Sequence, residues 1–207
     1  MKKIIRKDGI IYEREEKRGK ETIPSKQQYT ETIKELSTKK EWDVLLVVRM
    51  GCEMGMSRQD IVNAEIKNID RHHPRGLWIE TSKRVKRKGK YEMRSREVPI
   101  NSSLYSFIQN YIDSNNKYIL KRKKGNILKP NSEQKINELY EKGNVFWSPH
   151  KSRHYFRTQL KMWMRQQRSV DEELVDSLMG HQPKEAREMY GVIDWSYKQE
   201  VIDKVFN

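Results

Sequence analysis

The sequence has little of what marks several other classes of protein. Its 207 residues include one cysteine, Cys52, which excludes an internal disulfide framework and a multi-cysteine zinc site. No apolar run approaches the roughly 18 residues that a membrane span needs. The basic N-terminus also lacks an apolar stretch long enough for a signal peptide. These absences exclude small extracellular disulfide scaffolds and membrane-spanning proteins.

Acidic residues are scarce relative to basic ones. The 43 Lys and Arg outnumber the 29 Asp and Glu, so that the formal net charge is +14. Hydrophobic residues make up 35% of the chain, but they recur in periodic clusters, and a folded core is therefore expected. The length fits one domain of ordinary size, or a smaller domain with an arm. The charge indicates a polyanionic partner, most simply nucleic acid.

The apolar spacing predicts a mainly α fold with a small antiparallel β-sheet. Residues 1–24 are predicted to be a charged arm, with a short strand or hairpin around Asp8-Gly9, and residues 25–207 to be one domain. Helices are predicted after Ser25, over 40–54, from 58 to about 64, around 104–112 and over 133–141.

Between the third and fourth of these helices, the period changes from near 3.6 to 2. Residues 77–82 and 91–98 are predicted to be paired strands, closed by Pro99. The segment between them, residues 83–90, is predicted to be a hairpin tip that is too charged to be core. Residues 117–132 are predicted to be a basic connector.

The C-terminal third carries several helix-end signals. Residues 148–149 (Ser-Pro) predict the start of one helix, and residues 169–172 match the capping box of the next. Gly180 stands where a helix C-cap glycine belongs. A short helix from Pro183 and a last helix around 201–206 complete the prediction.

Four residues in this third are candidates for chemistry. His150 and Arg153 are three residues apart at the start of one helix, so their side chains leave the same face, and the helix N-terminus suits a phosphate group. His181 directly follows Gly180, and Tyr190 lies nine residues later. Taken singly, each of these residues is more often structural than catalytic.

Together these residues form a pattern. His150-Lys151-Ser152-Arg153, then Leu178-Met179-Gly180-His181, then Tyr190, resemble the tyrosine recombinase (phage integrase) family over roughly residues 25–200. That family has H-x-x-R, then L-G-H, then a nucleophilic tyrosine about nine residues further on. The resemblance implies the family's catalytic-domain fold. It also implies a site-specific DNA recombinase that cuts and rejoins DNA through a covalent 3′-phosphotyrosine, with neither a metal ion nor ATP nor any other cofactor.

The resemblance assigns a role to each residue. Tyr190 would attack the scissile phosphate, and Arg153 would hold its oxygens. His150 would take the tyrosine proton, and His181 would donate a hydrogen bond to the phosphate. Lys83, just after the first strand, would protonate the departing 5′ oxygen, with Lys86, Lys88 and Lys90 as rivals.

The family also expects an arginine in a box of the type T-G-L-R-x-x-E-L. Residues 55–62 occupy that place, but aligning Asp60 with the acid of the box puts Ser57 at the arginine position and Arg58 one residue late. Arg58 is predicted to be the first catalytic arginine, and Arg49 is the alternative.

The implied partner is double-stranded DNA at a specific attachment site, with self-association on DNA from dimer to tetramer. The residues predicted to bind DNA are Arg84, Lys86, Arg87, Lys88, Lys90, Lys121, Arg122, Lys123 and Lys124. The family's separate core-binding domain is not expected, because about 24 residues precede the first helix. The last helix would dock on its own core or on a neighbouring protomer.

The resemblance implies a cytoplasmic, nucleoid-associated protein of prokaryotic, viral or plasmid origin, without a membrane partner. Two alternatives stay open. One is a basic DNA-binding protein of the same fold with weak or lost cleavage, which the Ser57/Arg58 irregularity favours. The other is a type IB topoisomerase activity, which relaxes supercoils with much the same residues.

Overall fold

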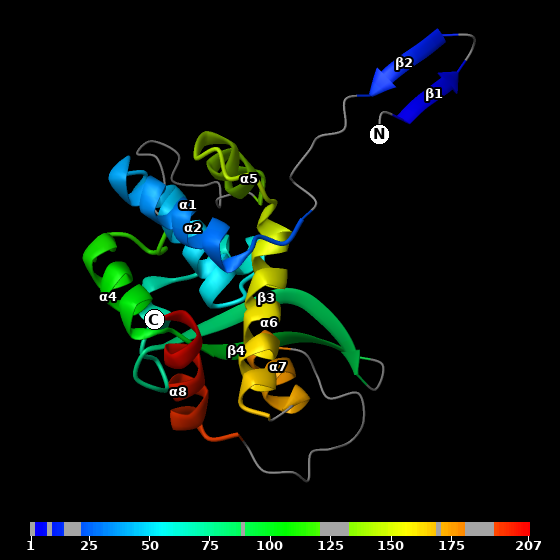
Figure 1. Ribbon diagram of the computed structural model, residues 1–207. Coiled ribbons are helices and arrows are strands. Elements are labelled where there is room, and N and C mark those ends of the chain that lie inside the picture. The colour runs from blue at the N-terminus through cyan, green and yellow to red at the C-terminus, as the bar shows by residue number, and fades with distance from the viewer. Residues whose placement is uncertain are drawn as a thin grey trace.

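Figure 1 shows the computed structural model, which describes residues 3–7, 10–14, 22–87, 90–120, 133–168, 171–180 and 193–207. The helices are α1 (Lys26–Thr38), α2 (Trp42–Glu53), α3 (Arg58–Asn63), α4 (Ser102–Tyr111), α5 (Glu133–Lys142), α6 (Pro149–Gln166), α7 (Glu172–Met179) and α8 (Trp195–Phe206), with a 3₁₀ turn at Ile66–Asn68. The strands are β1 (Lys3–Lys7), β2 (Ile10–Arg14), β3 (Gly76–Arg87) and β4 (Lys90–Pro99). The prediction of a mainly α fold with a small antiparallel sheet is confirmed.

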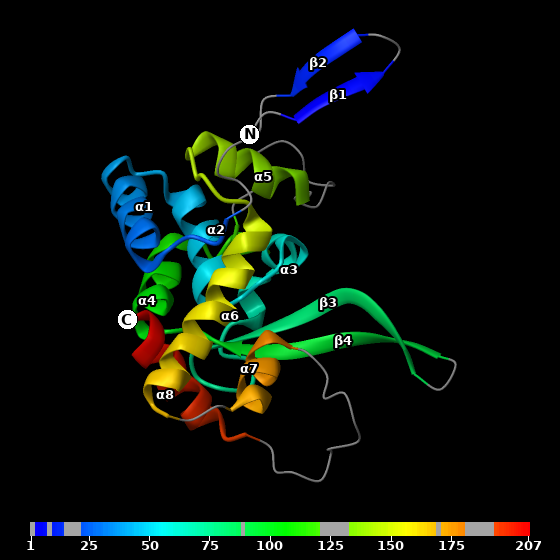
Figure 2. The same ribbon diagram turned by 45° about the vertical axis from the view of Figure 1, so that its right-hand side comes forward.

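The strands form two antiparallel hairpins, β1–β2 and β3–β4. The first agrees with the hairpin predicted around Asp8-Gly9. The second is longer than predicted, because β3 runs to Arg87 and β4 begins at Lys90, so the strands continue through most of the charged segment. Figures 1 and 2 show the far end of the β3–β4 hairpin extending beyond the helices. The backbone hydrogen bonds between two antiparallel strands can form there without apolar side chains packed over them.

Helix α2 is the centre of the core. Ten consecutive residues from Val44 to Glu53 are buried, because α1, α4, α5 and α6 surround the helix. It packs tightly against α6 at Gly51, where an added Cβ would lie 2.8 Å from the Cβ of Ser152. A larger residue at Gly51 would therefore push α6, which carries His150 and Arg153, away from the core.

A second apolar cluster joins α6, α7 and α8. Phe156 of α6 stacks on Phe206 of α8, with ring centroids 5.4 Å apart. Asp203 of α8 accepts a hydrogen bond from Arg75 at 2.9 Å, and Gln199 donates one to the Ile100 carbonyl at 2.6 Å. Helix α8 therefore docks on its own chain, which is one of the two arrangements expected.

Several helix ends follow the predicted chemistry. Ser25 and Ser57 each cap a helix in a reciprocal capping box with the residue three positions later. Gly180 ends α7 with a φ of +67°, a left-handed conformation that glycine adopts without steric cost.

Two of the predicted caps differ. Ser148 stands at the N-cap of α6, but its side chain makes no capping hydrogen bond. The N-cap of α7 is Asp171, whose carboxylate accepts from the Leu174 N–H at 2.8 Å, so the predicted capping box that began at Ser169 is replaced by an aspartate closer to the helix. Ser169 itself lies outside the described residues. Among the described helices, none has both the length and the apolar character to span a membrane.

Candidate functional site

The structure describes part of the predicted site. Arg153, His150, Arg58 and Arg49 are described with their side chains. Tyr190, His181, Lys88 and residues 121–124 lie outside the described residues, and so do the side chains of Lys83, Arg84, Lys86, Arg87 and Lys90. The described part of the site therefore consists of the arginines, their partners and the first histidine.

Arg153 lies on α6 and connects two segments that are distant in sequence. One terminal nitrogen of its guanidinium donates to the Gly55 carbonyl, between α2 and α3. The other donates to the Met179 carbonyl at 2.7 Å, at the end of α7. Gly55 has a φ of +62°, and an added Cβ there would lie 2.5 Å from the ring of Phe156. Glycine at this position therefore allows the loop carbonyl to reach the arginine.

His150 lies one turn before Arg153 and contacts another histidine. Its Nε2 is 2.9 Å from the Nε2 of His154, and the two rings are nearly perpendicular. Burial lowers the pKa of His154, and the nearby charges of His150, Lys151 and Arg157 lower it further. Side-chain clusters of three or more metal-ligating residues are absent from the described part of the chain.

Arg96 of β4 reaches the same end of α7 as Arg153. Its guanidinium donates to the Leu178 carbonyl at 3.3 Å and to the Asp60 carboxylate at 3.3 Å. Leu178 and Met179 are consecutive residues, so Arg96 and Arg153 bind neighbouring carbonyls at the C-terminal end of α7. The structure thus brings together two arginines from α6 and β4.

The two guanidinium groups share one counterion. Burial is the main reason that the pKa of Arg96 falls to about 10; the Asp60 carboxylate opposes this fall and the Arg153 charge adds to it. Burial also lowers the pKa of Arg153, again against the effect of Asp60. Arg96 stays protonated at neutral pH, because a pKa near 10 is far above 7.

Gly180 lies directly against Arg96. A Cβ added at Gly180 would be 2.3 Å from the Cδ and 2.7 Å from a terminal nitrogen of Arg96. The glycine therefore leaves the space that the arginine side chain occupies. It is also the residue immediately before His181.

Arg58 turns away from this group towards α5. It donates to the Asn137 side chain at 3.3 Å and forms an ion pair with Glu133 at 3.1 Å. Its side chain is 41% exposed. These contacts lie on a different side of α3 from Asp60, which faces Arg96.

Arg49 belongs to a polar cluster in the core. It binds both carboxylate oxygens of Glu53, at 2.7 and 3.0 Å, and the hydroxyl of Ser103 at 3.1 Å. Tyr29 and Asn101 also donate to Glu53. Arg49, the alternative to Arg58, therefore directs its described hydrogen bonds to partners in and beside the core.

The residues that sequence reasoning did not assign to the site are Arg96 and Asp60. Arg96 begins the R-x-V-P-I segment that closes the hairpin, and Asp60 is the acid of the arginine box. The one sequence feature that singled out Arg96 was its position at the start of the R-x-V-P-I segment. Its nearness to Arg153 depends on the packing of β4 against α7, which no local pattern encodes.

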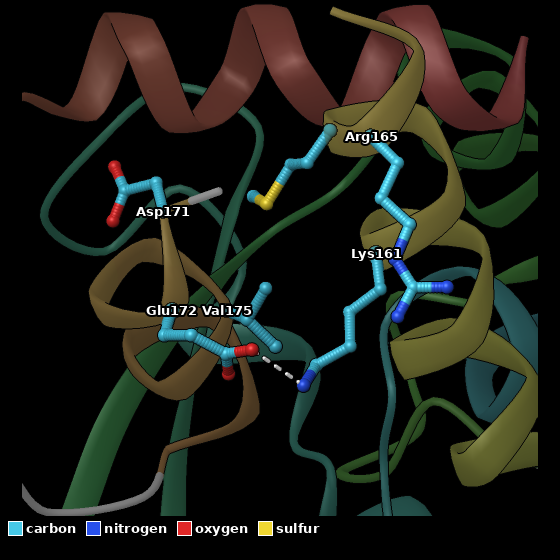
Figure 3. A pocket seen from close by; sticks show the side chains of 6 residues that line it. Lys161, Arg165, Asp171, Glu172 and Val175 are labelled. Atoms are coloured by element: carbon cyan, nitrogen blue, oxygen red, sulfur yellow. Dashed lines mark hydrogen bonds and ion pairs between the residues drawn. The ribbon is translucent and has the colours of Figure 1, made fainter. Parts of the chain in front are cut away.

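A separate small hollow lies between α6 and α7, lined in part by Lys161, Arg165 and Asp171. Figure 3 shows the hydrogen-bonded ion pair of Lys161 and Glu172 at its edge, with the two atoms 2.7 Å apart. Its lining from α6 lies at least two turns beyond Arg153, and its lining from α7 comes from the first turns of that helix, away from the carbonyls of Leu178 and Met179. The hollow is therefore not part of the arginine site.

Solved structures with a similar fold have low sequence identity to this chain. XerA recombinase superposes with a TM-score of 0.57 at 16% identity, over 91% of this chain and 66% of that one. The integrase of transposon Tn1549, in complex with circular intermediate DNA, gives 0.54 at 16% identity, over 88% and 64%. A lambda integrase dimer bound to a core site gives 0.52 at 13% identity, over 84% and 62%.

The chain thus spans less than two thirds of the length of these proteins. A search of curated protein sequences found no match. The family model described as the phage integrase family matches residues 10–192. This match covers most of the chain, including the H-x-x-R segment, the end of α7 and Tyr190. The chain belongs to the phage integrase family.

Proposed function

We propose that this chain is a site-specific DNA recombinase that breaks and rejoins DNA through a covalent bond between Tyr190 and a 3′ phosphate. The observation that carries the proposal is the hydrogen bond of Arg153 to the Met179 carbonyl. This bond joins the H-x-x-R segment to the end of α7, which leads directly into His181. Two sequence segments that the family's chemistry requires in one place are thus held in contact.

The first step is an in-line displacement at phosphorus. The Tyr190 oxygen forms a bond to the phosphorus, and the bond from phosphorus to the 5′ oxygen breaks. His150 takes the tyrosine proton, and Lys83 supplies a proton to the departing 5′ oxygen. A 5′ hydroxyl then reverses these steps and joins the strand. The phosphodiester energy is kept in the tyrosyl ester, and the exchange therefore consumes no ATP.

The negative charge on the nonbridging oxygens grows during this step. Arg153 is suited to bind these oxygens, because a guanidinium stays charged and presents paired N–H donors. His181 would add a hydrogen bond. A second guanidinium completes the arrangement, and the sequence predicts Arg58 for this place. Fixed donors of this kind typically contribute about 100- to 1000-fold each to the rate.

The partner proposed for the chain is double-stranded DNA. The net charge of +14 supports this, together with the basic residues of the β3–β4 hairpin and of residues 121–124. The Tn1549 and lambda integrase structures contain DNA, and the lambda structure is a dimer. We propose that this chain likewise binds an attachment site and self-associates on it.

A nicked DNA duplex tests the proposal. The nick lets the short strand with the free 5′ hydroxyl diffuse away, so that a cleaved complex cannot rejoin. The wild type is expected to form an SDS-resistant protein–DNA adduct on duplexes that cover the DNA flanking the gene, with or without EDTA. Tyr190→Phe is expected to form none. An adduct that Tyr190→Phe forms equally well, or one that EDTA abolishes, would contradict the mechanism.

A second candidate function is DNA binding without cleavage. It is favoured by Ser57, which stands at the family's arginine position and caps α3 by accepting from the Asp60 N–H at 3.2 Å. In this case the wild type would bind the same duplexes in a gel-shift assay but form no adduct, and Tyr190→Phe would bind equally well.

A further inference from the structure

The position that would supply the family's first catalytic arginine carries a serine, Ser57. An arginine from another element, Arg96 of β4, bonds the carboxylate next to it. Ser57 and Asp60 bind one another reciprocally, with the Ser57 N–H donating to the Asp60 carboxylate at 3.0 Å. The same carboxylate oxygen accepts from Arg96 at 3.3 Å. Arg96 therefore reaches the first turn of α3 through the carboxylate of Asp60.

The Arg96 side chain has donors to spare. A guanidinium carries five N–H groups. Arg96 uses one terminal nitrogen for the Leu178 carbonyl and the other for Asp60, both at 3.3 Å, which is long for such bonds. Its Nε is buried and has no hydrogen-bond partner among the described residues. A buried donor without an acceptor is costly, and a bound anion would relieve this cost.

The charge of the site also points to an anion. Arg96 and Arg153 together carry two positive charges, and Asp60, which is 5% exposed, is the carboxylate that acts on both. The group therefore has an excess of one positive charge in a region with little water. A phosphodiester carries one negative charge and would balance this excess. Further negative charge that develops on its oxygens during attack would still face two cations.

We infer that Arg96 and Arg153 form the phosphate-binding pair of this chain, and that Arg96 rather than Arg58 supplies the second guanidinium. This inference rests on the proposed function for its role in cleavage. Arg96 donates N–H bonds to a nonbridging oxygen and transfers no proton. The bonds that form and break are those of Tyr190 attack and departure of the 5′ oxygen.

The contacts of Arg96 and Arg58 decide which of the two supplies the second guanidinium. Arg58 binds Glu133 and Asn137 on α5, and its charge is already matched by a carboxylate of its own. Arg96 shares its carboxylate with Arg153, and its buried Nε has no acceptor within the described part of the chain. Arg58 therefore belongs to the contact between α3 and α5.

The test compares two DNA substrates in the nicked-duplex assay. One has an ordinary scissile phosphate, and the other has a methylphosphonate, in which a methyl group replaces one charged nonbridging oxygen. Arg96→Gln is expected to lower adduct formation on phosphate DNA by about 100-fold or more. On methylphosphonate DNA the deficit should shrink at least about tenfold, because less negative charge remains for the missing cation to stabilise.

Equal deficits of Arg96→Gln on the two substrates would mean that Arg96 acts only through structure and would overturn the inference. A substrate-dependent deficit in Arg58→Gln, with none in Arg96→Gln, would also overturn it. Arg96→Lys serves if Arg96→Gln does not fold. It keeps the charge but loses the paired donors, so it should fall between the wild type and a full loss.

A binding measurement separates this inference from the proposed function. At constant ionic strength, replacing chloride by inorganic phosphate should raise the melting temperature of the wild type, because phosphate binds the folded site. Arg96→Gln and Arg153→Gln should each lose this rise. Arg71→Gln is the matched control: Arg71 bonds Asn68 at 3.2 Å and lies over Trp78, and the variant should keep the rise.

The two proposals can then fail independently. A phosphate-dependent rise that disappears in Arg96→Gln, in a wild type that forms no DNA adduct, would refute the proposed function and support the anion site. A rise that Arg96→Gln keeps in full would refute the anion site, whatever the result with DNA.

Discussion

Gly180 is the point where the end of α7, the Arg96 side chain and the segment leading to His181 meet. Replacing it with alanine has two effects. The backbone must keep its φ of +67°, which costs an alanine about 1–2 kcal/mol. The new Cβ would also lie 2.3 Å from the Cδ of Arg96, a contact too close to persist. Because that atom belongs to a flexible side chain, we expect Arg96 to move rather than the fold to break.

The two effects have different sizes and different readouts. For a domain of this size, a loss of 1–2 kcal/mol lowers the melting temperature by about 2–8 °C, so Gly180→Ala should be folded at 25 °C. If the displaced Arg96 no longer reaches the phosphate, adduct formation on the nicked duplex should fall by about 100-fold. Cleavage would therefore fall far more than stability accounts for.

Two variants separate displacement from backbone strain. Gly180→Asn places a Cβ at the same point, but asparagine tolerates the left-handed conformation better, so cleavage should fall with a smaller loss of stability. Asn144→Ala introduces similar strain elsewhere, since Asn144 has a φ of 53° in the turn after α5. This variant should lose stability and keep cleavage. Wild-type cleavage by both Gly180 variants would refute the reasoning.

Three other predictions concern a buried ion pair, the effect of pH and the effect of salt. Glu53→Gln leaves the buried Arg49 without its carboxylate and should cost about 3–5 kcal/mol in the free energy of unfolding by urea titration, whereas Glu35→Gln, which breaks an exposed pair with Lys39, should cost at most about 1 kcal/mol. Because burial and nearby cations lower the pKa of His154, the unfolded chain binds more protons at mildly acidic pH; the free energy of unfolding should therefore fall as the pH drops through about 6.5, and His154→Gln should flatten this dependence. Replacing residues 121–124 by glutamine should reduce the slope of log affinity for DNA against log salt by about 0.9 for each phosphate that the variant no longer neutralises, and an unchanged slope would remove these residues from the DNA interface.

Local signals in the sequence predicted most of the elements. The starts of α1 and α3 were predictable because Ser25 and Ser57 each bond within their own first turn, and the end of α7 was predictable because Gly180 has the conformation that glycine favours. The length of the β3–β4 ribbon was not predictable from apolar alternation, because exposed strands do not need it. The cap of α7 was misplaced, because both Ser169 and Asp171 are residues that favour this position.

The site was predictable only in part, because most of its contacts join residues that are distant in sequence. His150 and Arg153 share one helix, so their spacing could be read from the sequence. The partners of Arg153 lie 98 and 26 residues away, and Arg96 reaches Leu178 across 82 residues. Such contacts arise from the packing of α3, β4, α6 and α7. The motif of Ser57 and Arg58 describes only the first of these elements, and it therefore gave no indication that β4 supplies a guanidinium.

The most direct test of the central claim is to identify the atoms joined in the protein–DNA adduct. The SDS-resistant complex from a nicked duplex would be digested with trypsin and nuclease, and the modified peptide sequenced by mass spectrometry. We expect a nucleotide joined through its 3′ phosphate to Tyr190, with a free 5′ hydroxyl on the other side of the break. An adduct on another residue, a linkage through the 5′ phosphate, or no adduct on any duplex from the flanking DNA would contradict the proposed mechanism.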